Sequence, residues 1–550
     1  MYKFHHPYQY LGDLDSYRRK RIPRNIIWGI LLFLGLSTLF YFGGADHLFQ
    51  DTKDESLHLN LEIKYESSSS GQAETRCHGQ GGIVGGLPGF YVFDRIWYKS
   101  GEFYIFTDQP DQITLPPLDA ISIGKNPVNV RPLSESPSFD NDGPDAKGIM
   151  RCYHDETIWM NVDVPTYSPP TTTDEDENGN LDRRVIPRSL NKRFNWEFHH
   201  YHFLAESLLG GIASLDLVRA GNNIALLPLG SREDKKQEKD QYRQVNNVER
   251  YSAYRMDQEI YDRQWLFIPW EEDWRDAYGL NEPIVKGLFD HRFVDAQRWN
   301  ETTDHGDWVG FERVVIIDRW SSHLYNTLAN QWNKMALDVF SLLPSIPPPD
   351  PSSSKGVESI FSPYRDRFLG YMNIQSLHRH KTGTALHEIP KIVYVDRQSS
   401  SRRLLNGTHD DLLDVLDGLD HRGKAKIQVG RLEEMSYGDQ IRLFADADII
   451  IGVHGNGLTH QVWMAPGGII IEIFPPGVFL RDYQLIAQVV GHEHIAILDS
   501  QIYTKQEWEN EPGKLLASRP DEANDRNITL SKDFIEDLLY LKLTNYQVVL

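Results

Sequence analysis

The chain has 550 residues, 40% of them apolar and 11% aromatic, which is enough for a folded body of two domains and excludes a largely disordered chain. Its 57 basic and 78 acidic residues give a formal charge of -21. This charge excludes general nucleic-acid binding, because a phosphate backbone requires a basic protein face.

The first predicted element is a transmembrane helix at residues 25–44, an uncharged run long enough to cross a bilayer. Basic residues precede it and acidic residues follow it, so residues 1–24 are expected in the cytosol and the body in the lumen. The alternative is a cleaved signal peptide. The run is long for a signal peptide and no A-x-A-like cleavage site follows, which favours the anchor.

Polar and low-complexity segments divide the rest of the chain. Residues 45–76 are expected to form a stem that holds the folded body away from the membrane. A Pro- and Ser-rich stretch at 344–356 marks the expected domain boundary. The resulting organisation is an N-terminal α/β domain at 77–343, a linker at 344–384, and a C-terminal α/β domain with a helical tail at 385–550.

Two cysteines and three glycosylation sequons bear on the compartment. Cys77 and Cys152 would be able to pair in an oxidising lumen, but two free buried thiols are nearly as well supported. Asn300, Asn406 and Asn527 begin N-x-T sequons on the predicted lumenal side. The sequons are consistent with a lumenal location of the body, although such triplets also occur by chance.

A possible catalytic pair occurs in the first domain, after β-rich runs at 90–98 and 102–107. The segment FNWEFHHYHFLAESLLGG (194–211) predicts the start of a helix, with His202 and Glu206 four residues apart on one face. Either side chain would be able to accept a proton from a substrate hydroxyl. The alternative is a half-buried structural pair among apolar neighbours.

Two acidic segments resemble metal-binding sequence motifs. Residues 174–185 resemble a calcium loop, but Val185 replaces the final glutamate ligand, so an acidic loop is favoured. Asp446 and Asp448 form an Asp-x-Asp triplet directly before an apolar strand. That is the wrong end of the strand for a ligand, and we predict no metal site.

The second domain alternates short apolar runs with helical segments from residue 391 to residue 498. This pattern is typical of a parallel sheet covered on both faces. Two such α/β units facing a cleft would bind a ligand at the carboxyl ends of their strands. The predicted fold class is therefore α/β, with two Rossmann-type domains.

Two segments at such strand ends suggest a phosphate site. The run KIVYV leads into a loop with Arg397, Arg402 and Arg403, whose guanidinium groups suit a diphosphate. DIIIGV ends in a glycine-rich turn before a predicted helix, where backbone N–H groups would reach a phosphate. Solvent-exposed arginines and a plain turn are the alternatives. This second segment continues to residue 477, and its candidate ligand-binding residues are His454, Gly455, Asn456, Gly457, Leu458 and Glu472.

Taken together, YHFLAES, DRQSSSRRLLN and HGNGL followed by PGGIIIEIFP resemble glycosyltransferase family 61, strongest over residues 190–500. The likeness is to its fungal, type II membrane-anchored members and to capsule-type xylosyltransferases. The resemblance implies a GT-B-like fold and inversion of the anomeric carbon. It also implies a nucleoside-diphosphate pentose or N-acetylhexosamine donor, with UDP as the expected nucleotide, and no required metal or other cofactor. His460 departs from the asparagine that often follows LT in the family.

The resemblance also implies roles for the candidates. Glu206 is expected to be the base, with His202 as its orienter or substitute and His454 as a third catalytic candidate. Arg397 and Arg402 or Arg403 would neutralise the leaving diphosphate. Glu472 would hold a ribose or sugar hydroxyl, or have a structural role.

The expected protein is therefore a single-pass enzyme of the Golgi or endoplasmic reticulum that extends a glycan or glycoprotein. Two alternatives remain: an inactive glycan-binding or scaffold protein with the same fold, and a secretory hydrolase with Glu206 as its acid. The hydrolase lacks an identifiable partner carboxylate.

Overall fold

A computed structural model describes most of the chain from residue 76 onward. Residues Ser69–Leu550 belong to one compact unit. The predicted membrane segment at 25–44, the acidic loop at 174–185 and the boundary stretch at 344–356 lie outside the described residues. No described helix is both long and apolar enough to cross a membrane. The described residues are 76–123, 127–137, 151–161, 200–220, 262–269, 274–276, 278–304, 306–332, 334–343, 357–379, 386–400, 402–476, 479–504, 507 and 527–547.

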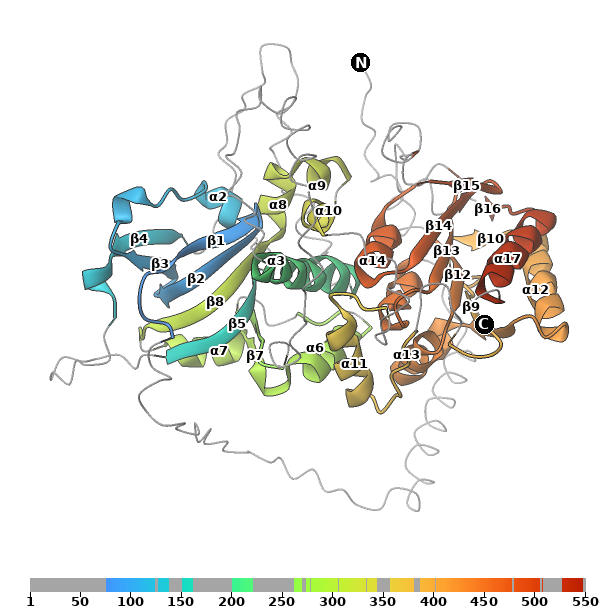
Figure 1. The fold of residues 1–550 in the computed structure, drawn as a ribbon, viewed down its shortest axis with the longest axis horizontal. Helices are drawn as coiled ribbons and strands as arrows, with labels where there is room; N and C mark the ends of the chain where they lie inside the picture. Colours follow the sequence, from blue (N-terminus) through green and yellow to red (C-terminus); the bar gives the residue numbers. More distant parts are fainter. Residues whose placement is uncertain are drawn as a thin grey trace, which may run out of the picture. The chain divides into compact units, whose positions relative to one another are not determined.

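The first sheet is mixed, with the strand order β4-β3-β2-β8-β5-β6-β7 and β1 beside β2 (Figure 1). Antiparallel pairs join β1, β2, β3 and β8, whereas β8, β5, β6 and β7 run parallel. The predicted β-rich start followed by an α/β arrangement is confirmed. The strands are β1 (Gly82–Leu87), β2 (Phe90–Lys99), β3 (Glu102–Thr107), β4 (Val128–Pro132), β5 (Arg151–Asn161), β6 (Trp265–Ile268), β7 (Phe293–Asp295) and β8 (Val309–Asp318).

A buried helix packs closely on this sheet. A π-helical segment, η6 (His202–Leu208), leads directly into α3 (Leu209–Arg219). A Cβ atom on Gly210 would lie 2.5 Å from the Phe90 ring, and one on Gly211 would lie 2.7 Å from Ile317. These glycines therefore let η6 and α3 approach the sheet. The other α-helices of this half are α2 (Leu118–Ile121), α6 (Asn281–Phe289), α7 (Ala296–Thr303), α8 (Arg319–Tyr325), α9 (Thr327–Trp332), α10 (Leu337–Leu342) and α11 (Ser362–Tyr371).

The second sheet has the order β11-β9-β12-β13-β14-β15, and all but the β14-β15 pair are parallel. The predicted parallel sheet is confirmed. Its strands are β9 (Lys391–Val395), β11 (Lys426–Gly430), β12 (Ile449–Val453), β13 (Ile469–Ile473), β14 (Glu493–Leu498) and β15 (Gln501–Tyr503); β10 (Arg403–Leu404) pairs with β16 (Asn527–Ile528) beside it.

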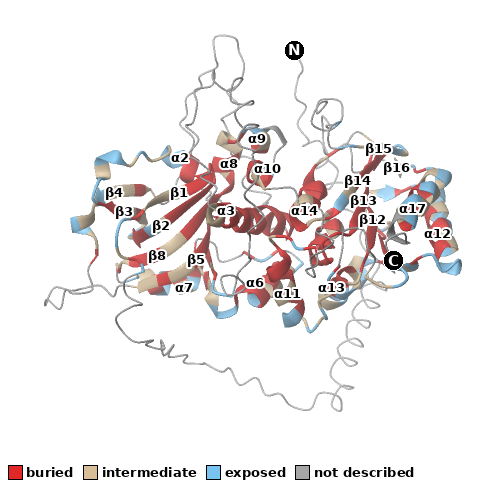
Figure 2. Cartoon of the chain, in the orientation of Figure 1, coloured by how far each residue is buried: buried red, intermediate tan, exposed pale blue. Residues whose placement is uncertain are grey.

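Helices cover both faces of the second sheet. Alternate strand residues point to opposite faces, so neighbouring residues of one strand belong to different cores. Ile392 belongs to a core with α12 (Asn406–His421) and α17 (Lys532–Gln547). Val393 belongs to the other core, with α13 (Tyr437–Ala445), the 3₁₀ helix η10 (Asn456–Trp463) and α14 (Asp482–Val490). The central strands are buried along their length (Figure 2).

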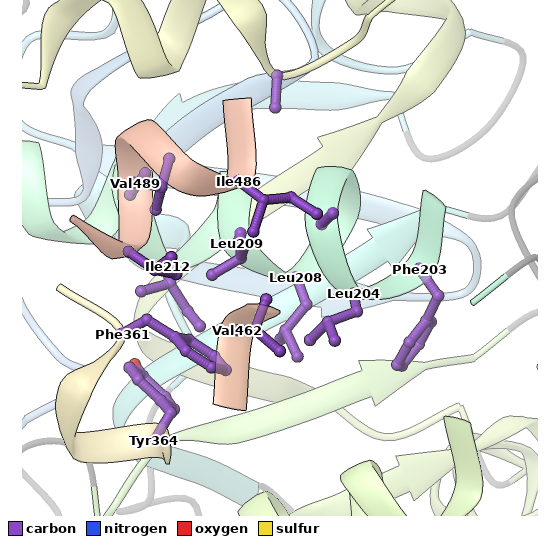
Figure 3. Close-up of a cluster of buried hydrophobic side chains, with 14 of the residues drawn as sticks. Phe203, Leu204, Leu208, Leu209, Ile212, Phe361, Tyr364, Val462, Ile486 and Val489 are labelled. Atoms are coloured by element: carbon purple, nitrogen blue, oxygen red, sulfur yellow. The ribbon is translucent and has the colours of Figure 1, made fainter. Parts of the chain in front are cut away.

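The second of these cores continues into the first half of the body. Figure 3 shows Leu209 and Ile212 of α3 gathered with Val462 of η10 and with Ile486 and Val489 of α14. All five side chains are buried. The two halves of the body therefore share an apolar core.

Each sheet has a point where the strand order reverses, and open α/β sheets bind ligands at such points. In the first sheet, β6 and β7 lie to one side of β5 and β8 lies to the other. In the second, β11 lies to one side of β9 and β12 to the other. Arg319 follows β8, Arg397 follows β9 and His454 follows β12, so candidate side chains stand at both reversals.

Candidate functional site

The pair predicted from the first motif is formed. His202 Nδ1 lies 2.5 Å from Glu206 Oε2, and both side chains are buried. The segment is a π-helix, a form found often at functional sites. The sequence predicted the helix and the pairing but not its π-helical winding.

Glu206 is surrounded by hydrogen-bond donors. Arg319 Nη1 donates to Oε2 over 3.2 Å, and the Met335 backbone N–H donates to Oε1 over 3.0 Å. Burial would raise the pKa of the carboxyl group. The charge of Arg319 and the hydrogen bond from His202 outweigh burial and bring the pKa of Glu206 well below its usual range. Glu206 is therefore an ionised carboxylate and a weak proton acceptor.

His202 has the complementary character. Burial, followed by the charge of Arg319, lowers the pKa of His202 to about 4, so the ring is neutral at pH 7. Since Glu206 is ionised, Nδ1 of His202 must carry the hydrogen between them, and Nε2 then has the lone pair. This is the arrangement of a histidine base oriented by a carboxylate.

The glycine-rich turn after β12 contacts the arginine loop after β9. Arg397 Nη1 donates to the carbonyl oxygen of His454 over 2.5 Å. A Cβ atom on Gly455 would lie 1.2 Å from that nitrogen, so only glycine leaves room for the guanidinium group. The two segments predicted to bind phosphate are thus joined. The helix expected after the turn is the 3₁₀ helix η10.

Behind this turn lies a buried row of three titratable side chains. Glu472 Oε1 lies 2.5 Å from His454 Nδ1, and its Oε2 lies 2.7 Å from His494 Nε2. Burial, followed by the nearby Asp482, raises the pKa of Glu472 well above its usual range, favouring the uncharged form. Burial lowers the pKa of His454 to about 3 and that of His494 to about 3. Glu472 therefore holds His454 in place from inside the sheet.

An ion pair connects the two motifs. Lys334, between α9 and α10, places its Nζ 2.5 Å from Asp482 Oδ1 at the start of α14. Asp482 Oδ2 also lies 3.7 Å from His454 Nε2. The Tyr201 hydroxyl, next to His202, donates to the backbone carbonyl of Asp482 over 3.3 Å. These contacts bring His202 and His454 into one cluster, here called the central cluster.

The central cluster is positively charged within an acidic protein. Two carboxylates act on the pKa values of its two histidines, and both carboxylates have lowered pKa values. Four cations act on the same histidines. The cluster therefore has about two more positive than negative charges. The carboxylates are Glu206 and Asp482, and the cations are Arg319, Lys334, Arg397 and Arg402.

A cavity of about 400 Å³ opens at the carboxyl ends of β9 and β11. Asp396, the residue before Arg397, is part of its lining, which is polar and has more acidic than basic side chains. Such a lining suits hydroxyl and amide groups better than phosphate. Its lining residues are Asp396, Gln398, Ser399, Asn406, His409, Asp410, Arg431, Glu433 and Glu434.

The remaining donor-side candidates have different surroundings. Arg402 is partly buried and its charge acts on His454, whereas Arg403 is exposed on β10. Leu458 is fully buried in the apolar core, so its side chain is structural. Asn456 Oδ1 accepts a hydrogen bond from Thr459 over 3.1 Å. A Cβ atom on Gly457 would lie 2.8 Å from Leu432.

The Asp-x-Asp triplet lies at the amino end of β12, where the sequence placed it. Asp448 is buried and pairs with Arg379, and the backbone N–H groups of Leu386 and Lys391 donate to it over 2.8 and 2.9 Å. Asp446 contacts His387 at 2.6 Å. Asp448 thus joins the preceding loop to the strand.

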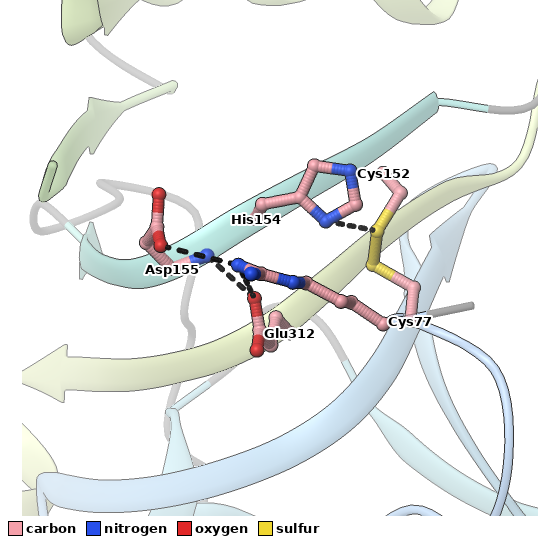
Figure 4. Close-up of a disulfide and its surroundings, with 6 residues drawn as sticks. Cys77, Cys152, His154, Asp155 and Glu312 are labelled. Atoms are coloured by element: carbon pink, nitrogen blue, oxygen red, sulfur yellow. Dashed lines mark hydrogen bonds and ion pairs between the residues drawn. A yellow bond between two sulfur atoms is a disulfide. The ribbon is translucent and has the colours of Figure 1, made fainter. Parts of the chain in front are cut away.

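The structure pairs the two cysteines. Cys77, before β1, forms a disulfide with Cys152 of β5, and His154 Nδ1 lies 3.5 Å from the Cys152 sulfur (Figure 4). Of the sequon residues, Asn300 and Asn406 are exposed. Asn527 lies in β16, and the described side chains do not include it.

Sequence reasoning missed several members of the central cluster. Arg319 directly follows the apolar run RVVIID, so the strand-end argument used for Arg397 would have found it. Asp482 begins α14, well beyond the end of β13 at Ile473, so the strand-end argument does not identify it. Lys334 lies between two short helices, where no pattern marks it. Tyr201 and Tyr483, whose ring centre lies 5.2 Å from that of His454, have the sequence pattern of core aromatic residues.

Comparison with known proteins agrees with the motifs. Residues 200–471 match the family described as Glycosyltransferase 61. A stretch of 68 residues is 43% identical to a beta-1,2-xylosyltransferase of Arabidopsis thaliana, covering 12% of this chain and 13% of that protein. Another, of 84 residues, is 32% identical to an EGF domain-specific O-linked N-acetylglucosamine transferase of Drosophila melanogaster, covering 15% of each chain. The chain thus matches only short segments of these relatives.

Proposed function

Because the chain belongs to glycosyltransferase family 61, we propose that it transfers a sugar from a nucleoside diphosphate to a hydroxyl group of a glycan. The observation that carries this proposal is the central cluster. It unites a neutral histidine, oriented by a carboxylate, with a group of cations at the carboxyl ends of two sheets. The first supplies a base and the second a site for a diphosphate.

The donor is proposed to lie at the reversal of the second sheet. Arg397 and Arg402 would face its phosphates, next to the turn at Gly455. The cavity lined in part by Asp396 would receive the uncharged nucleoside part, with UDP as the proposed nucleotide. The names of the relatives favour xylose or N-acetylglucosamine as the transferred sugar. Two Rossmann-type halves binding a donor in this way would constitute a GT-B fold.

The proposed reaction inverts the anomeric carbon. The acceptor oxygen attacks C1 while the bond between C1 and the phosphate oxygen breaks, and the leaving diphosphate takes that electron pair. The acceptor proton passes to Nε2 of His202. The sequence assigned the base to Glu206 and orientation to His202. The bonds from Arg319 and Met335 to Glu206 support exchanging these roles.

We also propose that the enzyme is a type II membrane protein of the Golgi or endoplasmic reticulum. The apolar run at 25–44 and its charged flanks support an anchor with a lumenal body. The Cys77–Cys152 disulfide supports an oxidising compartment. Protease added to intact microsomes should spare the body, and its digestion without detergent would contradict this topology.

The test of activity is a panel of sugar nucleotides offered to the purified full-length protein in detergent, with glycan acceptors of different terminal sugars. Mass spectrometry should detect one elongated glycan, together with release of the nucleoside diphosphate. Binding of a nucleoside diphosphate without turnover of any donor would favour the inactive glycan-binding alternative. Glycan cleavage without nucleotide would favour a hydrolase.

Transfer is proposed to need no divalent ion, because side-chain cations supply positive charge next to the proposed phosphate site. Activity should therefore persist within about twofold after treatment with EDTA. Activity that EDTA abolishes and manganese restores would contradict this expectation. A manganese-dependent transferase assayed in the same buffer provides the control.

A further inference from the structure

One buried lysine of the central cluster has been counted among its cations but has not been given a role of its own in the proposed reaction. Lys334 is 7% exposed, and its ammonium group lies 2.5 Å from Asp482 and 5.5 Å from the centre of the Tyr201 ring. Removing an ammonium group from water costs several kcal/mol, and a buried ion pair only partly recovers that cost. An apolar pair would connect the same elements at least as stably, so a lysine here calls for a functional explanation.

The position of Lys334 is fixed from two sides. The next residue, Met335, donates its backbone N–H to Glu206 over 3.0 Å, and the Ser322 hydroxyl donates to the carbonyl oxygen of Met335. On the other side, Asp482 holds the ammonium group and also approaches His454 Nε2 at 3.7 Å. Lys334 therefore stands between the proposed base pair and the turn proposed to bind the donor.

The charges of the central cluster indicate what Lys334 would meet. Among the charged side chains named as acting on His202 and His454, cations outnumber carboxylates by two, which would balance the two negative charges of a nucleoside-diphosphate sugar. Without Lys334 only one excess charge would remain. The excess matters most when the bond from C1 breaks, because the departing phosphate oxygen then gains a further negative charge.

We propose that Lys334 is a catalytic residue whose ammonium group binds the departing diphosphate, and that Asp482 is the residue that positions it. This inference rests on the proposed function. The lysine comes from the first half of the body and the arginines Arg397 and Arg402 from the second. The donor phosphates would then be held between cations of both halves. Only a donor that carries the second phosphate would engage Lys334 fully.

The test compares UDP with UMP as probes. In Lys334→Met, an uncharged side chain of similar length, UDP affinity measured by calorimetry should fall about tenfold while UMP affinity changes less than twofold. The turnover rate with the sugar nucleotide should fall at least a hundredfold, and Lys334→Arg should restore part of it. Lys286→Met is the matched control, since Lys286 forms a similar pair with Glu282 at 2.9 Å but is exposed.

A structural role would give a different pattern. If Lys334→Met lowers the melting temperature and weakens UDP and UMP equally, or leaves turnover unchanged, the proposal is overturned. Asp482→Asn should reduce turnover less than Lys334→Met, because the ammonium group remains. Wild-type protein that binds neither nucleotide and transfers no sugar would instead overturn the proposed function, and this inference with it.

Discussion

At the residue scale, the account depends on which group of the His202–Glu206 pair accepts a proton. A fully exposed histidine and glutamate would titrate near 6.5 and 4.5. In the central cluster the pKa of His202 falls to about 4, and that of Glu206 falls well below its usual range. Burial destabilises the charged form of His202, whereas the charge of Arg319 keeps the Glu206 carboxylate ionised. Both partners are therefore ready for their proposed roles at neutral pH.

The lowered pKa of His202 predicts an unusual pH profile. A base must be deprotonated to act, and His202 is deprotonated above about pH 4. The ratio kcat/KM should therefore stay level from pH 7 to about pH 5 and fall about tenfold per pH unit below pH 4. Recovery of the rate on return to pH 7 would show that the fall is titration. A fall beginning near pH 6.5 would show that an ordinary, exposed histidine is the base.

The sequence could predict individual residues only where a pattern marked them. His202, Glu206, Arg397 and His454 belong to motifs, and the structure brings all four into the central cluster. Lys334 could not be predicted in this way, because its position results from contacts with Glu206 and Asp482 that are distant in sequence.

At the element scale, the strands of the second sheet could be predicted well. They are buried on both faces, so they appear as continuous apolar runs such as IIIGV. The winding of the connecting segments could not be predicted. The expected helices at the two catalytic motifs are a π-helix at His202–Leu208 and a 3₁₀ helix at Asn456–Trp463. These forms differ from an α-helix by one hydrogen-bond step, which apolar periodicity does not resolve.

The turn after β12 gives a prediction at this scale. Gly455→Ala would place a methyl group against the Arg397 guanidinium, whose contact is the movable end of a long side chain. The fold should therefore survive, with less than about 1 kcal/mol lost, while UDP affinity falls about tenfold because Arg397 is displaced. Gly370→Ala is the control, as its Cβ would meet no atom within 4 Å. Unchanged UDP affinity in Gly455→Ala would contradict the proposal that Arg397 binds the donor.

At the scale of the whole molecule, a shared apolar core and a disulfide stabilise the body. The disulfide links residues 75 positions apart and ties the segment before β1 to β5. The pairing could not be decided from the sequence, since two cysteines in a chain of this length are compatible with free thiols. The two-sheet arrangement could be predicted, because strand and helix patterns alternate through both halves. Contacts between the two halves could not be predicted, because they join residues that are distant in sequence.

Loss of the disulfide should destabilise the body without removing the site. Cys77→Ser with Cys152→Ser should lower the free energy of unfolding by about 2 to 5 kcal/mol, chiefly because the unfolded chain gains freedom. Denaturant titration measures this change. Affinity for UDP at low temperature should be unaffected, since the disulfide joins the segment before β1 to β5, outside the central cluster. A loss of UDP binding without a loss of stability would contradict this separation.

The measurement that tests the central claim most directly is a comparison of turnover and UDP affinity in His202→Gln, Glu206→Gln and Arg397→Ala. The account predicts that turnover falls by about 10² to 10⁴ in His202→Gln and less in Glu206→Gln, both with nearly unchanged affinity. Arg397→Ala should weaken UDP binding by about 1.5 to 3 kcal/mol. Near-normal turnover in His202→Gln with an inactive Glu206→Gln would show that Glu206 is the base. Normal turnover in both would contradict the claim that sugar transfer occurs at this cluster.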